Sequence, residues 1–194
     1  MIRLALLRHG HTAWNRAGRV QGRTDIPLDA EAVAQLSSLR LPEDWEDAQL
    51  VSSPLQRAFE TARLVTGRTP LTDPALIEMN WGDWEGARAA ELAADPEKDH
   101  RHIEDWGWHY TPPNGESPQQ VKNRLAPWLS GLKEDTVAVC HIGIMRVVLA
   151  MATGWNFDGP APFVVKRNRL FVVTLHGAEM RLEPEQVRLL ERQT

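Results

Sequence analysis

Residues 2–15 have the sequence IRLALLRHGHTAWN, and this stretch decides the expected fold. Its first six residues are apolar apart from Arg3, which predicts a strand buried in a sheet. Arg8, His9 and His11 follow directly. Because open α/β sheets bind ligands beyond the carboxyl ends of their strands, these cationic and imidazole side chains are candidates for an anion site.

Two later strands are predicted to end near similar residues. Arg57 lies in the first turn of the helix that follows the second predicted strand, and His141 directly follows another. Strands of this kind end at one edge of a sheet, so we expect Arg57 and His141 to lie beside Arg8 and His9. Two guanidiniums, two imidazoles and a helix N-terminus together suit a phosphate dianion.

Strands and helices are predicted to alternate along the chain, which indicates an α/β fold. Asp29, Ser53 and Ser117 are predicted to cap helices, and Gly67 and Gly154 to end them. The predicted strands cover residues 2–7, 48–51, 135–140 and 169–175, with an edge or strand end at 74–78. The predicted helices cover 30–39, 54–66, 118–132 and 142–153, a lid or inserted helical excursion covers 87–114, and a short charged helix begins at Pro184.

Length and composition predict a single globular domain over residues 1–194. The chain has 42% hydrophobic and 25% charged residues, within the ordinary range of soluble domains. Its formal net charge of -4 argues against a general binder of nucleic acid or of anionic membranes. An anionic ligand must therefore be held by a local cluster of cations.

Cys140 is the single cysteine of the chain, which excludes an internal disulfide and a four-thiolate zinc site. It is expected to be a buried strand residue. The apolar run between Arg3 and Arg8 is too short for a signal peptide or a membrane-spanning helix, so a cytoplasmic protein is expected.

Several motifs, taken in order, resemble those of the histidine phosphatase superfamily, also called the phosphoglycerate mutase-like family. The motifs are RHGHTAWN (8–15), QGRTDIPL (21–28), SSPLQRAFETA (52–62), LIEMNWGDWEG (76–86), PPNGES (112–117) and the pair His141 with Gly143. RHG alone is a weak signal, whereas the ordered set is strong. The resemblance implies a three-layer sandwich with a mostly parallel central sheet and helices on both faces.

The resemblance also implies a metal-independent reaction, without a cofactor, through a phosphohistidine. Carried over by motif, His9 is the nucleophile and Glu78 the acid. The implied phosphate or substrate contacts are Arg8, Asn15, Gln21, Gly22, Arg57, His141 and Ile142. The stretch that ends in QGRTDIPL looks more like the branch with broad-specificity and α-ribazole phosphatases than like the mutases.

Two positions depart from the family pattern. His11 stands where the family most often has Glu, and Ile142 stands where it often has Gly after the second His. The first is expected to tune the site. The second either narrows the space near the phosphate or packs. Neither departure removes a catalytic group.

The chemistry can be argued without the family. A neutral imidazole can attack phosphorus, and Arg8 and Arg57 beside His9 would lower its pKa, because a further positive charge is disfavoured there. Fixed donors around the phosphoryl group would stabilise the charge of a loose transition state. An alkoxide leaves poorly without a proton, which a Glu78 of raised pKa would supply before it activates water.

Other assignments of the same residues remain open. Glu85, and to a lesser degree Asp83, compete with Glu78 for the acid, and Asn15 could simply cap a turn. The histidines His100, His102 and His109 fit a solvated lid better than a metal site, because carboxylates at ligand spacing are lacking. The tryptophans Trp81, Trp84, Trp106 and Trp108 either pack or stack on an aromatic leaving group.

The leading hypothesis is a phosphoric monoester hydrolase that acts on a small phosphorylated metabolite, without nucleic-acid or membrane partners. One alternative is a phosphoglycerate mutase-type isomerase, which keeps the phosphohistidine dry and returns the phosphate to a bound sugar acid. Another is a catalytically silent module that binds a phospho-ligand. Whether the chain is a monomer or a homodimer stays open.

Overall fold

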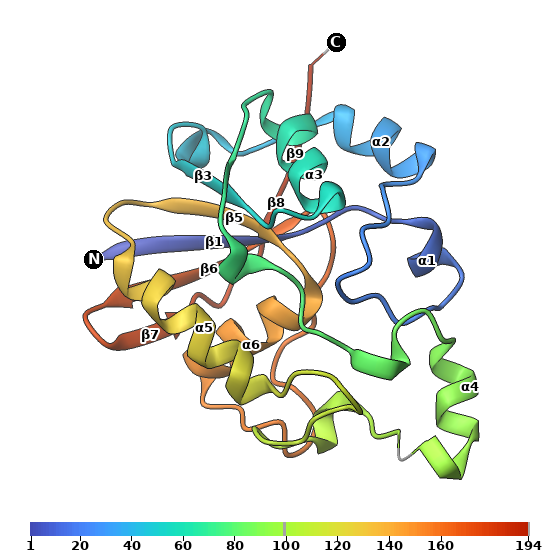
Figure 1. The fold of residues 1–194 in the computed structure, drawn as a ribbon. Helices are drawn as coiled ribbons and strands as arrows, with labels where there is room; N and C mark the ends of the chain where they lie inside the picture. The colour runs from blue at the N-terminus through green and yellow to red at the C-terminus, as the bar shows by residue number, and fades with distance from the viewer. Residues whose placement is uncertain (99, 194) are drawn as a thin grey trace.

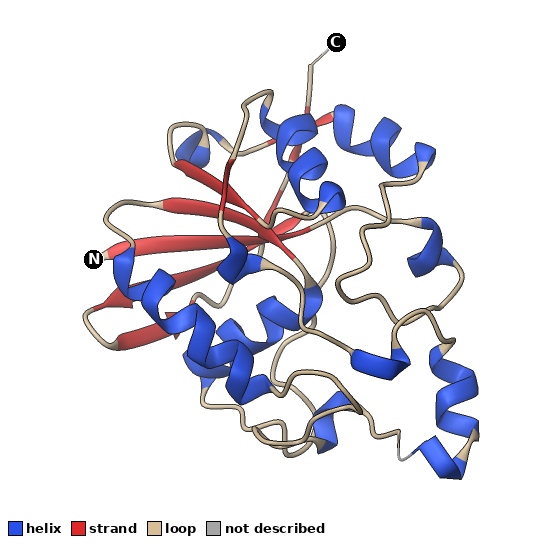
Figure 2. Ribbon diagram, in the orientation of Figure 1, coloured by secondary structure: helices blue, strands red, loops and turns tan. Residues whose placement is uncertain are grey.

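A mixed sheet forms the centre of the computed structural model, which describes residues 1–98 and 100–193 (Figures 1 and 2). Its strand order is β4-β3-β5-β1-β6-β7, and β8 pairs with β6. The strands are β1 (Ile2–Arg8), β3 (Gln49–Ser52), β4 (Leu71–Thr72), β5 (Thr136–Cys140), β6 (Arg169–His176), β7 (Glu179–Leu182) and β8 (Val187–Arg188). A separate antiparallel pair joins β2 (Leu39–Arg40) to β9 (Leu190–Glu191).

The helices lie on both faces of this sheet. In Figure 1, α2 and α3 lie above the sheet and α5 and α6 below it. The α-helices are α1 (Ala13–Arg16), α2 (Ala30–Ser37), α3 (Gln56–Thr66), α4 (Ala89–Ala94), α5 (Pro118–Gly131) and α6 (Ile142–Thr153). The 3-10 helices are η1 (Glu43–Trp45), η2 (Pro74–Leu76), η3 (Gly82–Trp84), η4 (Pro96–Lys98) and η5 (Ile103–Asp105). The predicted three-layer α/β fold is confirmed.

Strand direction places the ends of the central strands side by side. β1 pairs with β5 in parallel, and β5 with β3 and β3 with β4 pair in the same way. β6 joins the other side of β1 antiparallel. The register puts Arg8 opposite Cys140, so the residues that follow β1 and β5 emerge next to each other.

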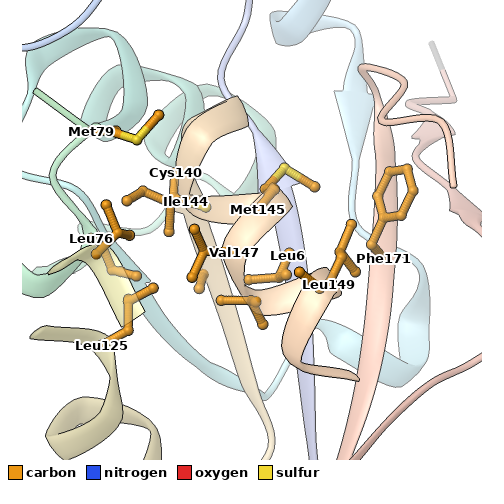
Figure 3. Packing of buried hydrophobic residues seen from close by; sticks show 14 of the residues in the cluster. Leu6, Leu76, Met79, Leu125, Cys140, Ile144, Met145, Val147, Leu149 and Phe171 are labelled. Carbon is orange, nitrogen blue, oxygen red and sulfur yellow. The ribbon is translucent and has the colours of Figure 1, made fainter. Parts of the chain in front are cut away.

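Burial on both faces explains why β1 is apolar almost throughout. Leu4 and Leu6 belong to the core between the sheet and helices α5 and α6. Ala5 and Leu7 belong to the core on the opposite face, between the sheet and helices α2 and α3. Figure 3 shows the first core, where Leu6 faces side chains of α6. A strand packed on both faces has no solvent side, so its polar residues collect at its end.

Most helix boundaries follow the predicted caps. Asp29 accepts a hydrogen bond from the N–H of Ala32 at the start of α2, and Ser117 and Gln120 form a capping box at α5. α6 ends at Gly154, which has a φ of 76°, the left-handed region that glycine adopts without strain.

The start of α3 differs from the prediction. The helix begins at Gln56 with Leu55 as N-cap, two residues after the predicted first position at Pro54. The Ser53 hydroxyl accepts from the N–H of Leu55 and lies 2.7 Å from Nε2 of His141, so it does not cap the helix. Arg57 still falls in the first turn, as predicted.

Two further predictions of secondary structure are wrong. Residues 74–78 are not a strand: Asp73 accepts from the N–H of Ala75 and starts η2, while β4 lies just before it. The tail after Pro184 is not a helix, because residues 187–188 pair with β6 and residues 190–191 pair with β2. Tertiary pairing overrides the local preference in this tail.

The stretch 87–114 contains α4, η4 and η5 joined by loops. Aromatic rings pack its described part against the preceding segment: the ring centroid of Trp106 lies 5.4 Å from that of Trp81 and 6.0 Å from that of Trp84. Whether this stretch acts as a lid stays a prediction. Among the described residues, no helix is long and apolar enough to cross a membrane.

Candidate active site

His9 and His141 lie side by side where β1 and β5 end. The N–H of His9 donates to the carbonyl of Cys140 over 3.0 Å, and the two imidazole centroids are 5.1 Å apart. Both side chains are almost fully buried. The predicted convergence of these histidines is confirmed, and it follows from the register of Arg8 with Cys140.

The surroundings of His9 set the position of its proton. Nδ1 lies 2.7 Å from the carbonyl oxygen of Gly10, which can only accept a hydrogen bond. Nδ1 therefore carries the hydrogen of the neutral ring, and Nε2 keeps its lone pair. Burial lowers the pKa of His9 well below its ordinary value, and the charges of Arg57 and Arg8 lower it further. A neutral ring with an available Nε2 can act as a nucleophile.

The guanidinium of Arg57 is buried and is held by two backbone carbonyls. Its two terminal nitrogens donate to the carbonyls of Thr24 (2.9 Å) and Gly22 (2.6 Å). Its Nε is buried without a partner among the described residues, as is Nε of Arg8. Burial, followed by repulsion from Arg167, lowers the pKa of Arg8 to about 9. These unpaired donors can bind an anion.

Glu85 supports the loop that holds Arg57. Its Oε1 accepts from the backbone N–H of Thr24. A Cβ built on Gly22 would come within 2.7 Å of Oε2 of Glu85, so Gly22 leaves room for this carboxylate. Thr24 and Gly22 supply the carbonyls that bind Arg57. By holding the backbone of Thr24, Glu85 therefore stabilises the position of Arg57 without contacting it. Glu85 is not among the residues that line the site cavity.

Glu78 presents the buried carboxyl group of the site. Its Oε1 accepts from the N–H of Met79 at 2.7 Å, and its Oε2 accepts from the N–H of Gly143 at 3.2 Å. Burial raises the pKa of Glu78, although these two hydrogen bonds and the charges of Arg57 and Arg8 oppose the shift. A carboxyl group of raised pKa can hold a proton and donate it.

Asn15 fits both of its predicted roles. It closes the capping box of α1, in which its Oδ1 accepts from the N–H of Thr12 (3.2 Å). The same oxygen accepts from Arg167 at 3.0 Å. With Oδ1 occupied by two donors, Nδ2 is the group that Asn15 can offer to an anion in the cavity it lines.

Gln21 is held in a similar way. Its Oε1 accepts from the hydroxyl of Thr12 over 2.9 Å, and its Nε2 is buried without a partner among the described residues. Gln21 therefore adds another donor to the same wall of the cavity.

The cavity at this site has a volume of ≈ 170 Å³. It is lined by Arg8, His9, Asn15, Arg19, Val20, Gln21, Glu78, Trp81 and Ile142. Ile142 thus lines the cavity, whereas His11 does not. Of the four tryptophans considered above, only Trp81 is among the lining residues, and Trp84 and Trp106 pack in the core. A larger cavity of ≈ 640 Å³ lies around Met1 and Arg3 at the opposite end of β1 and has no part in this site.

Three neighbours of the site are not indicated by the sequence patterns. Arg167 precedes β6 and donates from Nε to the carbonyl of His9 at 3.2 Å. Arg146, one helical turn after Ile142 on α6, lowers the pKa of Arg8 by repulsion. Ser53 lies against His141. The spacing of Ile142 and Arg146 could have indicated a shared helix face, whereas no local signal marks Arg167.

The remaining titratable candidates lie apart from this chemistry. The described residues contain no group of three or more His, Cys, Asp or Glu side chains placed to hold a metal ion. His100 packs beside Trp84, with 4.9 Å between ring centroids. Cys140 is buried as predicted, and burial raises the pKa of its thiol, so it is not a reactive thiolate.

Comparison with known proteins agrees with the geometry. The family described as "Histidine phosphatase superfamily (branch 1)" matches residues 4–185. The adenosylcobalamin/alpha-ribazole phosphatase of Escherichia coli K12 is 33% identical over 172 residues, which cover 80% of this chain and 84% of that protein.

Two solved structures share the fold over nearly the whole chain. One is a phosphoglycerate mutase from Thermus thermophilus, with a TM-score of 0.74 and 35% identity, covering 98% of this chain and 100% of that one. The other is mycobacterial hydrolase 1, with a TM-score of 0.80 and 26% identity, covering 98% and 99%. The relatives thus include proteins named as phosphatases and as mutases.

Proposed function

The chain belongs to the histidine phosphatase superfamily, branch 1, and from this premise we propose that it is a metal-independent phosphomonoesterase acting on a small phosphorylated metabolite. The observation that carries the proposal is the pairing of a buried, neutral His9, whose Nε2 keeps its lone pair, with unpaired donors at Arg8 and Arg57. The name of the E. coli relative is consistent with a hydrolase, and the mutase named from Thermus thermophilus keeps the isomerase as the alternative.

The first step transfers the phosphoryl group to His9. Nε2 attacks phosphorus and forms the N–P bond while the P–O bond to the leaving group breaks. The carboxyl proton of Glu78 passes to the departing oxygen, which leaves as an alcohol. The raised pKa of Glu78 supports this role, because the group must be protonated before the step.

The second step hydrolyses the phosphohistidine. The Glu78 carboxylate takes a proton from a water molecule whose oxygen attacks phosphorus, and the N–P bond breaks. Inorganic phosphate leaves, and His9 regains its lone pair on Nε2. Glu78 is again protonated, so both groups return to their starting states.

The transferred group is held by fixed donors throughout. We assign this role to Arg8, Arg57, His141, Asn15 and Gln21, with Gly22 anchoring Arg57 and Ile142 bounding the space. Such preorganised donors stabilise the charge on the equatorial oxygens without reorganisation during the reaction. The cations also supply the charge that a divalent metal provides in other phosphatases.

Trapping the intermediate tests the proposal. After rapid quenching with a labelled phosphomonoester, we expect an acid-labile, alkali-stable phosphoryl group on His9. His9→Ala should lose both the label and turnover, because no other residue in the lining given above has an imidazole nitrogen that could act as the nucleophile. An undiminished label in His9→Ala would reject the assignment.

Two controls separate the alternatives. Activity should survive exhaustive chelation, and loss with EDTA that a divalent metal restores would contradict the metal-free mechanism. Release of inorganic phosphate without a bisphosphorylated activator indicates the phosphatase, whereas return of the group to a bound sugar acid indicates the mutase. A silent binding module would give no turnover at all.

A further inference from the structure

We propose that Ser53 is a positioning residue that holds His141 in the tautomer with hydrogen on Nδ1, so that His141 donates to the phosphoryl group. This assignment rests on the phosphate-binding role proposed above for His141. Both side chains are fully buried, and Ser53 Oγ lies 2.7 Å from Nε2 of His141. The two residues are 88 positions apart in the sequence.

The Ser53 hydroxyl has one proton, and its neighbours decide where that proton goes. The N–H of Leu55 donates to Oγ over 3.2 Å, so this contact uses the oxygen as an acceptor. The other polar partner of Oγ is Nε2 of His141. If Ser53 accepted from both, its own proton would have no acceptor in a buried site, which costs free energy. Ser53 therefore donates to Nε2.

A neutral His141 whose Nε2 accepts must carry its hydrogen on Nδ1. Burial, followed by His9 and Arg57, lowers the pKa of His141 well below its ordinary value, which keeps the ring neutral. Nδ1 is buried without a partner among the described residues. In the opposite tautomer, Nδ1 would have no hydrogen to donate.

Two hydrogen bonds to the backbone of Ser53 hold this residue in place for this role. The N–H of Ser53 donates to the carbonyl of Val139 at 2.9 Å, which ties the end of β3 to β5 just before His141. The hydroxyl of Ser52 donates to the Ser53 carbonyl at 3.0 Å. The backbone of Ser53 is thus fixed against β5, and its hydroxyl accepts from the N–H of Leu55. The helix α3 accordingly starts only after Leu55.

Ser52 offers a matched control for Ser53. It is equally buried, is also a serine and lies one position earlier, but its hydroxyl contacts a carbonyl and not His141. The variants needed are Ser53→Ala, Ser53→Thr and Ser52→Ala, with His141→Gln used only to assign the His141 signals.

The deciding measurement is the ¹⁵N spectrum of the histidine rings in the full-length protein. In the wild type and in Ser52→Ala, we expect a protonated Nδ1 and an unprotonated Nε2 for His141. In Ser53→Ala, the hydrogen should move at least partly to Nε2, because that atom loses its donor. An Nε2-protonated ring in the wild type, or an unchanged Nδ1-protonated ring in Ser53→Ala, would overturn the proposal. This readout does not depend on catalysis.

Activity gives the second readout. Ser53→Ala should lower the rate of His9 phosphorylation and weaken competitive inhibition by inorganic phosphate, each by roughly 10-fold. The reason is that His141 would then lack, at least in part, the hydrogen on Nδ1 that it donates to the phosphoryl group. Ser53→Thr keeps the hydroxyl and should recover most of the loss, and Ser52→Ala should change neither quantity. If the tautomer moves but neither quantity changes, the phosphate role of His141 fails while the positioning by Ser53 stands. If Ser53→Ala does not fold, the pair Ser53→Thr and Ser53→Val answers the same question. Ser53→Thr should keep the wild-type spectrum and rate, and Ser53→Val, which lacks the hydroxyl, should lose both.

Discussion

Glu78 and Glu85 lie seven residues apart in one motif, but they have different surroundings. Glu78 lines the cavity and its pKa is raised by burial, whereas Glu85 binds the N–H of Thr24 outside the cavity. A general acid matters most when the leaving oxygen is basic, and it contributes roughly 10²–10⁴-fold. Glu78→Gln should therefore slow phosphorylation of His9 strongly for an alkyl phosphate and weakly for p-nitrophenyl phosphate.

The measurement must be the pre-steady-state release of alcohol or nitrophenol, because both substrates share the later hydrolysis step. Glu85→Gln is the matched control. It should weaken binding of both substrates to a similar degree, because it loosens the carbonyls that hold Arg57. A loss confined to the alkyl substrate in Glu85→Gln, and not in Glu78→Gln, would move the acid to Glu85.

At the scale of single residues, the sequence predicts positions that depend on strand ends and misses those that depend on loop paths. Arg8, His9 and His141 follow directly from two apolar strands that neighbour each other in the sheet. Arg167 reaches His9 across 158 positions from a loop whose course no local pattern specifies. The hydroxyl of Ser53 looks like a helix cap in the sequence, and only the tertiary structure shows that it faces His141.

At the scale of elements, the N-terminus of α6 sets the position of the candidate acid. The N–H of Gly143 donates to Oε2 of Glu78, and a Cβ on Gly143 would overlap Oε1 of the same carboxyl group. Gly143→Ala should therefore displace Glu78 and slow phosphorylation by an alkyl phosphate roughly 10²-fold, the lower end for a general acid. Single-turnover kinetics would measure this loss.

Gly131 is the matched control for Gly143. It also lies in a helix, α5, but a Cβ there would meet open space. Gly131→Ala should keep full activity and change the free energy of unfolding by at most about 1 kcal/mol. A Gly143→Ala variant as active as Gly131→Ala would show that Glu78 does not depend on this contact.

Elements with their own caps and periodicity were predictable, whereas elements made by distant pairing were not. α2 and α5 start at the side chains expected from the sequence. The tail is different: β8 and β9 are two residues each and exist only because β6 and β2 pair with them. Such short strands have no periodicity of their own, so the charged sequence of the tail predicts a helix instead.

At the scale of the whole molecule, the buried histidines link the site to the stability of the fold. Burial lowers the pKa of His9 and of His141 well below the ordinary value, so both are neutral in the folded protein near neutral pH. In the unfolded chain each takes up a proton as the pH falls through about 6.5. The stability that these groups contribute is thus complete above pH 6.5 and decreases on acidification, until the folded pKa values are reached.

We therefore expect the free energy of unfolding to fall below pH 6.5, with these two groups adding up to about 2.7 kcal/mol per pH unit. Urea unfolding at several pH values between 7.5 and 5 would measure the slope. The double variant His9→Gln with His141→Gln should have a clearly flatter profile, since it removes both groups. The raised pKa of Glu78 acts in the opposite sense, because the folded protein binds its proton more tightly than the unfolded chain. Glu78→Gln should accordingly steepen the acid side, and a double histidine variant with the wild-type slope would show that protonation of this site does not control acid stability.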